Sequence, residues 1–299
     1  MPNPSFELND TCPNNTGQIF HAVPWFSPTQ GTPDYLNSCS SFLGVPENLW
    51  GYQNAHSGNA YAGLFASMND TSMGIYNYRE YVEVKLDSAL TGGVKYFVSF
   101  YLSLSDSMNF ATDRIGAYFS NDTVKNDSLY GYMLYQTAQV ENPSGSFLTN
   151  KFTWTKISGS FIATGGEQFL TIGNFHNDFN TNTTPVGGAS PVLADWAGGY
   201  YYLDDVCVST DSVFAATWTG IFHSNTTNIK IFPNPASTDF VVTNLPPHSM
   251  YNIVDVMGKV IQSGELTGLN SRISVSTFNN GVYFLLLNNK YSFKIIINH

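Results

Sequence analysis

Short runs in which apolar and polar residues alternate recur along this chain, and this two-residue period constrains its fold more than any other feature. In Glu80–Leu86, for example, Val82 and Val84 are expected on the inner face of a strand and Tyr81 and Glu83 on the outer face. Turn signals containing paired glycines separate such runs, and no 3.6-residue period persists over a useful window. The pattern therefore predicts an all-β chain in which helices are minor.

The expected strands form two groups. The first group is Ser5–Leu8, Tyr61–Ala66, Glu80–Leu86, Lys95–Leu104, Arg114–Ser120, Phe152–Ile162, Gln168–Asn174 and Tyr200–Val208. This set predicts a jelly-roll β-sandwich over residues 1–209. The alternation is lost over residues 210–228, which we interpret as a linker. Short strands return over residues 229–299, and their number is that of a small Ig-like β-sandwich. They are Ile229–Phe232, Asp239–Thr243, Met250–Val256, Lys259–Gly264, Arg272–Val275, Gly281–Leu287 and Tyr291–Ile297.

The composition is that of an extracellular β-protein and excludes nucleic acid as a partner. Charged residues make up 11% of the chain, against roughly 25% in typical soluble domains. The formal net charge of −10 leaves no basic surface to neutralise phosphates. No apolar run reaches the ~18 residues that would span a bilayer. Met1–Pro4 has neither a basic nor an apolar region, so we expect any export leader to have been removed.

The three cysteines do not form a metal-binding pattern. Cys12 and Cys39 lie in the same irregular N-terminal region, and we expect them to form a disulfide in an oxidising compartment. Cys207 is then expected to be a buried free thiol.

The run Tyr200–Val208 contains two adjacent carboxylates, which is unusual inside a strand. Neighbouring side chains of a pleated strand point to opposite faces, so Asp204 is expected inside and Asp205 on the other face. A buried carboxylate needs a cation, a positive side chain or a set of backbone N–H groups. Because Lys and Arg together number only 12, a hard cation is the attractive choice among the three.

Four blocks near the end of the chain resemble a known secretion signal. The blocks are Ile231–Ala236, Val254–Lys259, Asn280–Phe284 and Lys294–Ile297. Their order, spacing and terminal position resemble the type A sorting domain of the Bacteroidota type IX secretion system. The motif residues are Pro233, Asn234, Pro235, Asp255, Gly258, Gly281, Tyr283 and Lys294.

This resemblance implies export by the type IX secretion machinery to the outer-membrane cell surface or beyond, and normally removal of the domain and its replacement by a surface anchor. Within the blocks, Asp255 and Gly258 suit a tight turn, and Gly281 is expected to supply backbone freedom before a core strand. The alternative interpretation is an Ig-like adhesion repeat.

Three shorter patterns in the first domain resemble carbohydrate-binding modules of the family 4/9/22 type, which are galactose-binding-like jelly rolls. The patterns are Asn3–Glu7, a turn at Ser57–Asn59, and Leu203–Val206. The resemblance implies a structural calcium ion held between the first and last strands. The ligands carried over are the Ser5 carbonyl, the Glu7 carboxylate, a carboxylate of Asp204 or Asp205, and carbonyls of the loop that ends at Asn59. The alternative is that Glu7 only accepts backbone N–H bonds.

Aromatic residues in the loops are the candidate ligand-binding groups. Trp25, Tyr35, Trp50, Tyr52 and Trp196 lie in loops rich in Pro, Gly and Asn. Flat rings beside amides and carboxylates suit a sugar, which has apolar faces and a hydroxyl rim. The alternative is that some of these rings cap the ends of the sandwich.

The sequence therefore predicts a secreted, non-catalytic cell-surface protein that binds a polysaccharide or surface glycan. The first alternative is a structural adhesin, or a self-associating subunit of a surface fibre or sheath. The second is a glycoside hydrolase, which needs two carboxylates roughly 5–9.5 Å apart. Several acids are available for such a pair, but nothing in the sequence singles one pair out. They are Glu47, Glu80, Glu83, Asp178 and Asp195.

Overall fold

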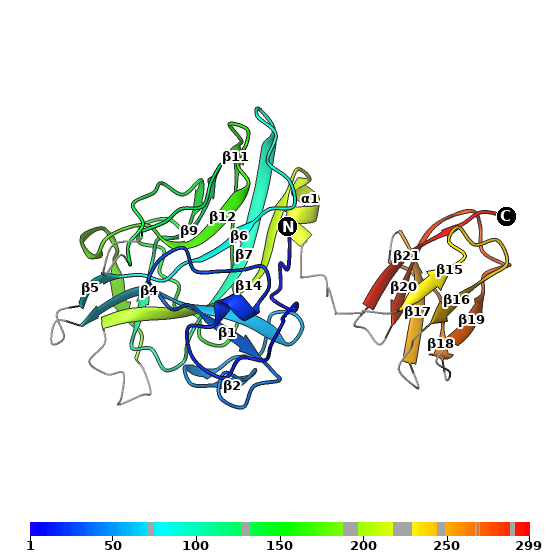
Figure 1. Ribbon diagram of the computed structural model, residues 1–299, viewed down its shortest axis with the longest axis horizontal. Helices are drawn as coiled ribbons and strands as arrows, with labels where there is room; N and C mark the ends of the chain where they lie inside the picture. Colours follow the sequence, from blue (N-terminus) through cyan, green and yellow to red (C-terminus); the bar gives the residue numbers. More distant parts are fainter. Residues whose placement is uncertain are drawn as a thin grey trace. The chain divides into compact units, whose positions relative to one another are not determined.

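A computed structural model describes residues 1–70, 75–126, 132–187, 197–217, 229–243, 249–256, 258–266, 268, 270–287 and 291–299. The chain divides into two compact units, Met1–Gly220 and Ile221–His299 (Figure 1). Each unit has its own hydrophobic core. Both are built almost entirely of strands, as the alternation predicts. Within the described ranges, no helix has both the length and the apolar character needed to cross a membrane.

The first unit is a β-sandwich of two antiparallel sheets. The larger sheet has the order β1-β4-β14-β7-β11, with β5 paired to β4. Its strands are β1 Asp34–Asn37, β4 Ala60–Asp70, β5 Ile75–Tyr78, β7 Lys95–Leu104, β11 Thr155–Ile162 and β14 Ala197–Ser209. The smaller sheet, β10-β9-β12-β6, consists of β6 Val82–Lys85, β9 Ile115–Ser120, β10 Val140–Glu141 and β12 Phe169–Asn174. The predicted jelly-roll sandwich is confirmed.

Shorter elements surround these two sheets. They are the hairpin β2 Glu47–Asn48 and β3 Gly51–Tyr52, the pair β8 Phe110–Thr112 and β13 Thr183–Pro185, the 3₁₀ turns η1 Ile19–His21 and η2 Asp178–Asn180, and the helix α1 Ser212–Thr217.

Strand β14 occupies the middle of the larger sheet, between β4 and β7 (Figure 1). Tyr200, Tyr201 and Tyr202 are all fully buried, so both faces of this strand are covered. The Tyr200 hydroxyl donates to the Asp34 carboxylate, and the Tyr201 hydroxyl donates to the carbonyl of Leu148. A central strand covered on both faces carries a nearly continuous apolar run, which explains why this segment does not alternate.

The outer face predicted for Glu80–Leu86 is exposed at Lys85, but at Tyr81 and Glu83 it is covered, and there the prediction is wrong. Tyr81 and Glu83 are both fully buried. Tyr81 packs with Leu134 and Phe175 in a small second core, and Glu83 accepts a hydrogen bond from the Thr171 hydroxyl at 2.7 Å. The segment before β10 covers this face of the smaller sheet, which a local pattern does not reveal.

The predicted first strand, Ser5–Leu8, does not form: Ser5 lies in a turn, and Glu7 and Leu8 are irregular. Asn3 and Phe6 have positive φ angles of 41° and 58°, and the Phe6 N–H donates to the Asn3 carbonyl at 3.3 Å. These conformations are incompatible with an extended strand.

The predicted linker begins with an ordered helix. In α1, the carbonyl of Ala215 accepts hydrogen bonds from the Ser99 hydroxyl at 3.1 Å and the Lys156 ammonium at 2.9 Å. The helix therefore docks on β7 and β11 and belongs to the first unit. Residues 218–228 of the expected linker lie outside the described residues.

Both cysteine predictions are confirmed. Cys12 and Cys39 form a disulfide, and Cys207 is a buried free thiol. Burial raises the pKa of the Cys207 thiol to about 11.

The second unit is a sandwich of a three-stranded and a four-stranded sheet. The first has the order β15-β16-β19 and the second β18-β17-β20-β21. The strands are β15 Lys230–Phe232, β16 Asp239–Thr243, β17 Ser249–Asp255, β18 Val260–Leu266, β19 Asn270–Ser274, β20 Gly281–Leu287 and β21 Tyr291–Ile297. Phe240, Ile253, Leu285 and Ile295 are buried between the sheets. This is the small Ig-like sandwich predicted for residues 229–299.

Candidate functional site

A pocket of about 350 Å³ lies beside β1, β4 and β5 in the first unit. We call it the Trp50 pocket. Asp34 of β1, Phe65 and Met68 of β4, and Tyr78 of β5 contribute to it from the sheet. The full lining is Thr16, Thr32, Asp34, Leu49, Trp50, Phe65, Met68, Tyr78 and Glu80.

The Trp50 ring is held in place by other rings and by its own turn. Its backbone N–H donates to the Asn48 side-chain oxygen at 2.9 Å, which forms the turn between β2 and β3. The indole stacks on Tyr200 with 4.7 Å between ring centroids and meets the Phe65 ring edge-on at 5.2 Å. Tyr78 in turn packs edge-on against Phe65, with 6.2 Å between the ring centroids.

Asp34 holds the same indole through a hydrogen bond from its ring N–H. Its Oδ2 accepts the Trp50 Nε1–H at 2.6 Å and the Tyr200 hydroxyl at 2.7 Å, and its Oδ1 accepts the Gly17 N–H at 2.7 Å. The Asp34 side chain is 1% exposed. Burial raises the pKa of Asp34, and the three hydrogen bonds only partly oppose that rise.

Glu80 is the second buried carboxylate of the pocket. Its Oε1 accepts the Tyr78 hydroxyl at 2.7 Å and the Thr32 hydroxyl at 3.1 Å, and its Oε2 accepts the Phe65 N–H at 2.9 Å. Burial, followed by the nearby charge of Asp34, raises the pKa of Glu80 to about 7.

The arrangement can bind a ligand that offers an apolar face to the rings and polar groups to the rim. The rings of Trp50 and Tyr78 can contact the apolar face of such a ligand, and Thr16 and Thr32 are polar residues of the lining. The two carboxylates are almost inaccessible and already accept hydrogen bonds from the protein. Their geometry makes them positioning groups for the rings.

Sequence reasoning named Glu80 among several acids but did not single out Asp34. Asp34 could have been identified by the same feature as Asp204, a carboxylate within a run of apolar residues. Asp34 begins β1 directly before the buried Tyr35 and Leu36.

Two of the five predicted sugar-binding rings are core residues, so their assignment is wrong. Trp25 is 1% exposed, packs on Phe6 at 4.8 Å and donates its Nε1–H to the Asn3 carbonyl at 2.8 Å. Tyr35 is fully buried and donates its hydroxyl to the Phe6 carbonyl at 3.0 Å. The N-terminal segment covers both rings, as the alternative of capping rings predicts.

Of the other predicted rings, Trp50 lines the pocket and is half-buried. Tyr52 is 54% exposed on β3 of the same hairpin, although it does not line the pocket. Trp196 lies outside the described residues.

The predicted inward carboxylate, Asp204, is fully buried. Its Oδ2 accepts the backbone N–H groups of His56 at 2.9 Å and Ser57 at 3.2 Å, and its Oδ1 accepts the N–H of Asp205 at 2.7 Å. Backbone N–H groups were one of the three partners considered for it. Burial, and then the charge of Asp205, raises the pKa of Asp204 well above its ordinary value.

Asp205 was expected on the opposite face, but it is also fully buried. The register of β14 shifts after Asp204, and Asp205 takes a positive φ of 51°. This bulge turns its carboxylate toward the same loop, where Oδ1 accepts the hydroxyls of Ser5 at 2.5 Å and Ser57 at 2.6 Å. Its Oδ2 contacts His56 Nδ1 at 2.5 Å.

Glu7 reaches this cluster from the N-terminal segment. Its Oε1 accepts the N–H groups of Asn59 at 2.7 Å and Ala60 at 3.0 Å, as the hydrogen-bond alternative predicts. The predicted calcium ligands Ser5, Glu7, Asn59, Asp204 and Asp205 thus gather around one loop, and their oxygens suit calcium in type.

Their geometry, however, is accounted for by hydrogen bonds. Among the described residues, no group of three or more His, Cys, Asp or Glu side chains is arranged to hold a metal ion. Calcium binding therefore stays a prediction.

In the second unit, the motif block at Pro233–Pro235 joins the first strand to the last. The Asn234 side chain donates to the Lys294 carbonyl and accepts the Ile296 N–H, both at 2.8 Å. Asn234 therefore clamps β21, and its place between two prolines ends β15.

The predicted tight turn between β17 and β18 is confirmed. The Gly258 N–H donates to the Asp255 carbonyl at 3.0 Å, and the Lys259 N–H donates to the Asp255 Oδ1 at 3.0 Å. Gly258 has a φ of +80°, a conformation that favours glycine.

Gly281 does not need such freedom, so that part of the prediction is wrong. It starts β20 without a positive φ, and an added Cβ would meet the Tyr283 ring no closer than 3.8 Å. Tyr283 itself donates its hydroxyl to the Asn279 carbonyl at 3.0 Å.

Residues 230–298 match the family model for the secretion system C-terminal sorting domain. No curated protein matches the chain. Among solved structures, the chain is similar to the CBM22-1 xylan-binding domain of Paenibacillus barcinonensis Xyn10C, with 13% identity, 68% of this chain and 89% of that chain covered, and a TM-score of 0.35.

The chain is also similar to the K1 cleaved adhesin domain of Lys-gingipain from Porphyromonas gingivalis W83, with 13% identity, 70% and 96% coverage and a TM-score of 0.35. The same holds for TmCBM61 in complex with β-1,4-galactotriose, with 13% identity, 71% and 97% coverage and a TM-score of 0.26. At these TM-scores the likeness carries no argument about what this chain binds.

Proposed function

We propose that this protein, whose C-terminal type IX sorting domain directs it to the cell surface or into the medium, is a non-catalytic glycan-binding protein. The sorting domain engages the type IX secretion machinery, and the jelly roll is the cargo. The glycan binds in the Trp50 pocket.

The observation that carries this proposal is the fixed, half-buried ring of Trp50 in a pocket of about 350 Å³. The Tyr200 ring stacks on the indole, and the indole Nε1 donates to Asp34 Oδ2 at 2.6 Å. A ring already fixed in its binding orientation loses little conformational entropy when a sugar stacks on it. The exposed Tyr52 on the same hairpin is a further contact for a longer chain of sugars.

Binding is favoured over hydrolysis because the two carboxylates of the pocket, Asp34 and Glu80, are buried and already hydrogen-bonded. A glycosidase needs two carboxylates that reach the scissile bond. Asp34 and Glu80 are 1% and 2% exposed, and their oxygens accept hydrogen bonds from Trp50 and Tyr78. Both line the pocket, but their oxygens are occupied in holding the rings and hydroxyl groups around it.

A glycan array followed by affinity electrophoresis in the soluble polysaccharides that bind would test the proposal. We expect Trp50→Ala to weaken binding by roughly 1–3 kcal/mol, since a buried aromatic anchor dominates such contacts. Phe152→Ala is the matched control, because Phe152 is an 85% exposed loop ring that does not line the pocket. Equal losses in both variants, or hydrolysis of the bound glycan, would contradict the proposal.

A further inference from the structure

Strand β11 has an open edge. It is the outer strand of the larger sheet and pairs only with β7 among the described residues. The Ala163 N–H donates to the Val94 carbonyl at 3.0 Å, and the Ala163 carbonyl accepts the Gly93 N–H at 2.8 Å, so this residue faces the β7 side. By alternation along an antiparallel pair, the backbone groups of Ser158, Ser160 and Ile162 point away from β7.

Lys156 near the start of β11 is turned toward the carbonyls of α1, and beyond it this edge carries none of the residues that usually prevent strand pairing. Ser158, Gly159 and Ser160 are exposed, and the span from Ile157 to Ile162 contains no charged residue and no proline. Natural proteins generally protect exposed edges with Lys, Pro, bulges or a covering segment. An unprotected edge is a template for adding a strand.

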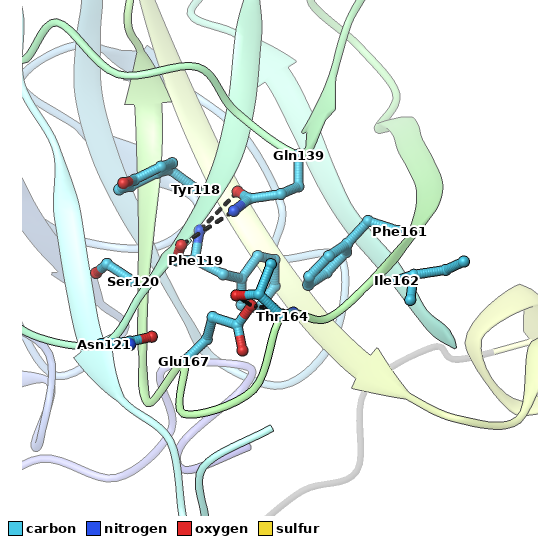
Figure 2. Close-up of a pocket in the computed structure, with 9 residues that line it drawn as sticks. All are labelled: Tyr118, Phe119, Ser120, Asn121, Gln139, Phe161, Ile162, Thr164 and Glu167. Atoms are coloured by element: carbon cyan, nitrogen blue, oxygen red, sulfur yellow. Dashed lines mark hydrogen bonds between the residues drawn. The ribbon is translucent and has the colours of Figure 1, made fainter. Parts of the chain in front are cut away.

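The neighbouring edge of the smaller sheet, at β9, is covered. Beyond the two-residue β10, the side chain of Gln139 takes the place of another strand residue (Figure 2). Its Oε1 accepts the Phe119 N–H at 2.8 Å and its Nε2 donates to the Phe119 carbonyl at 3.0 Å. One edge is therefore closed by a side chain, while the edge of β11 is left open.

A cavity of about 380 Å³ lies beside the end of this open edge. The rings of Phe119 and Phe161 are 4.7 Å apart, with Gln139 on one side of them and Thr164 with Glu167 on the other (Figure 2). The full lining is Tyr118, Phe119, Ser120, Asn121, Gln139, Phe161, Ile162, Thr164 and Glu167. A strand added to β11 would present every second side chain to this space.

The charged residue that lines the cavity is Glu167. Burial alone would raise the pKa of Glu167, but hydrogen bonds from Thr164 and Gly165 outweigh it and lower that pKa, so the carboxylate is ionised at neutral pH. The chain as a whole has a formal net charge of −10. A positively charged partner is therefore favoured over an acidic one.

We propose that the β11 edge and this cavity bind an extended segment of a partner polypeptide. The segment adds a strand to the larger sheet through the backbone groups of Ser158, Ser160 and Ile162. It places a bulky apolar side chain in the cavity against the partly buried ring of Phe161, and a flanking Lys or Arg near Glu167. This site shares no lining residue with the Trp50 pocket.

The probe is a blocked, fluorescently labelled seven-residue peptide in which threonine alternates with valine, phenylalanine and lysine. Fluorescence anisotropy with the full chain is expected to show saturable binding. Ser160→Pro removes an N–H on the open side, which an edge strand tolerates, and should weaken binding about tenfold. Ser160→Ala keeps that N–H and is the matched control, with unchanged binding.

Peptide variants test the cavity and the charge. Replacing the peptide's phenylalanine by alanine, or its lysine by glutamate, should each weaken binding. Hydrogen exchange of the wild-type chain supplies an independent readout: the N–H groups of Ser158, Ser160 and Ile162 should exchange quickly alone and slowly with peptide. Polysaccharide binding should be the same in Ser160→Pro as in wild type, which separates this proposal from the glycan pocket.

Three results would overturn the proposal. The first is no saturation up to about 1 mM peptide, which corresponds to only ~4 kcal/mol of binding. The second is equal peptide affinity of Ser160→Pro and Ser160→Ala, with no change in exchange at the edge. The third is a wild-type dimer in sedimentation that Ser160→Pro dissociates while the peptide does not bind. That last result would assign the edge to a second copy of the chain.

Discussion

The indole Nε1 of Trp50 donates to Oδ2 of Asp34 at 2.6 Å. Trp50 lies in the turn between β2 and β3, whereas Asp34 begins β1 and is only 1% exposed. A buried carboxylate thus fixes the ring that lines the pocket. Since Tyr200 donates to the same oxygen at 2.7 Å, the central strand, the first strand and the β2–β3 hairpin meet at one atom.

This contact predicts that Trp50→Phe and Trp50→Ala will differ. Trp50→Phe keeps an aromatic ring but removes one donor from Asp34, so stability should fall by about 1–3 kcal/mol while part of the glycan affinity remains. Trp50→Ala should lose the affinity as well. Urea unfolding combined with affinity electrophoresis checks both. Full affinity in Trp50→Ala would show that the ring is not a ligand contact.

The buried Glu80 predicts a pH dependence of stability. Because its folded pKa of about 7 exceeds the ordinary value of 4.5, the native state retains a proton that the unfolded state has released between these two values. Below about pH 4.5, Glu80 therefore contributes its full stabilisation of roughly 3 kcal/mol to the free energy of unfolding. This contribution is lost as the pH rises to about 7.

Denaturant unfolding between pH 4.5 and 8 checks this dependence. Glu80→Gln cannot ionise and should flatten the curve over the window relative to wild type. Glu47→Gln, at an exposed carboxyl, is the control and should leave the curve unchanged. An identical slope in wild type and Glu80→Gln would rule out this role for Glu80.

The corrected position of Trp25 predicts a stability effect and no direct effect on binding. Its ring is buried against Phe6, so Trp25→Ala should cost about 3–5 kcal/mol. Phe152→Ala, at an exposed ring, should stay within about 0.5 kcal/mol of wild type. Thermal melts measure both, and glycan affinity is then compared well below the transition. Wild-type stability with lost affinity in Trp25→Ala would restore it as a ligand contact.

Calcium binding at the Asp204 cluster predicts a chelator effect. An ion that binds only the folded state stabilises it by about 2.7 kcal/mol at a hundredfold excess over its Kd. We therefore expect EDTA to lower the melting temperature of wild type, and the double variant Glu7→Gln with Asp204→Asn to lose this response. Superimposable melting curves with and without chelator would leave the hydrogen bonds to Glu7 and Asp204 as the full account of the cluster.

The sorting domain predicts a localisation change. Removing residues 229–299 in a host with a type IX system should leave the jelly roll in the periplasm, since the matched domain lies within that span. Cell fractionation and surface labelling measure the result against the full chain. Surface labelling of the truncated protein at the level of the full chain would contradict the prediction.

The sequence alone determined the fold class and most of the strands of the two sandwiches. In the second unit Asp239–Thr243, Gly281–Leu287 and Tyr291–Ile297 are found with the predicted bounds, and in the first unit Lys95–Leu104 is as well. Alternation, turn residues and motif spacing are local properties, so they can be recognised without knowing what packs against a strand. The cysteine pairing was accessible for a related reason, because only two cysteines share one irregular region.

Tertiary structure decided which side chains are buried and which of them meet. Trp25 and Trp50 have similar loop surroundings in the sequence, yet the N-terminal segment buries one and the other lines a pocket. A one-residue bulge after Asp204 placed Asp205 inside as well. Asp34 and Glu80 are 46 positions apart in the numbering and became electrostatically coupled only through the folding of β1 against β4. Burial and pairing depend on distant segments that cover a face, and no local period encodes where those segments will lie.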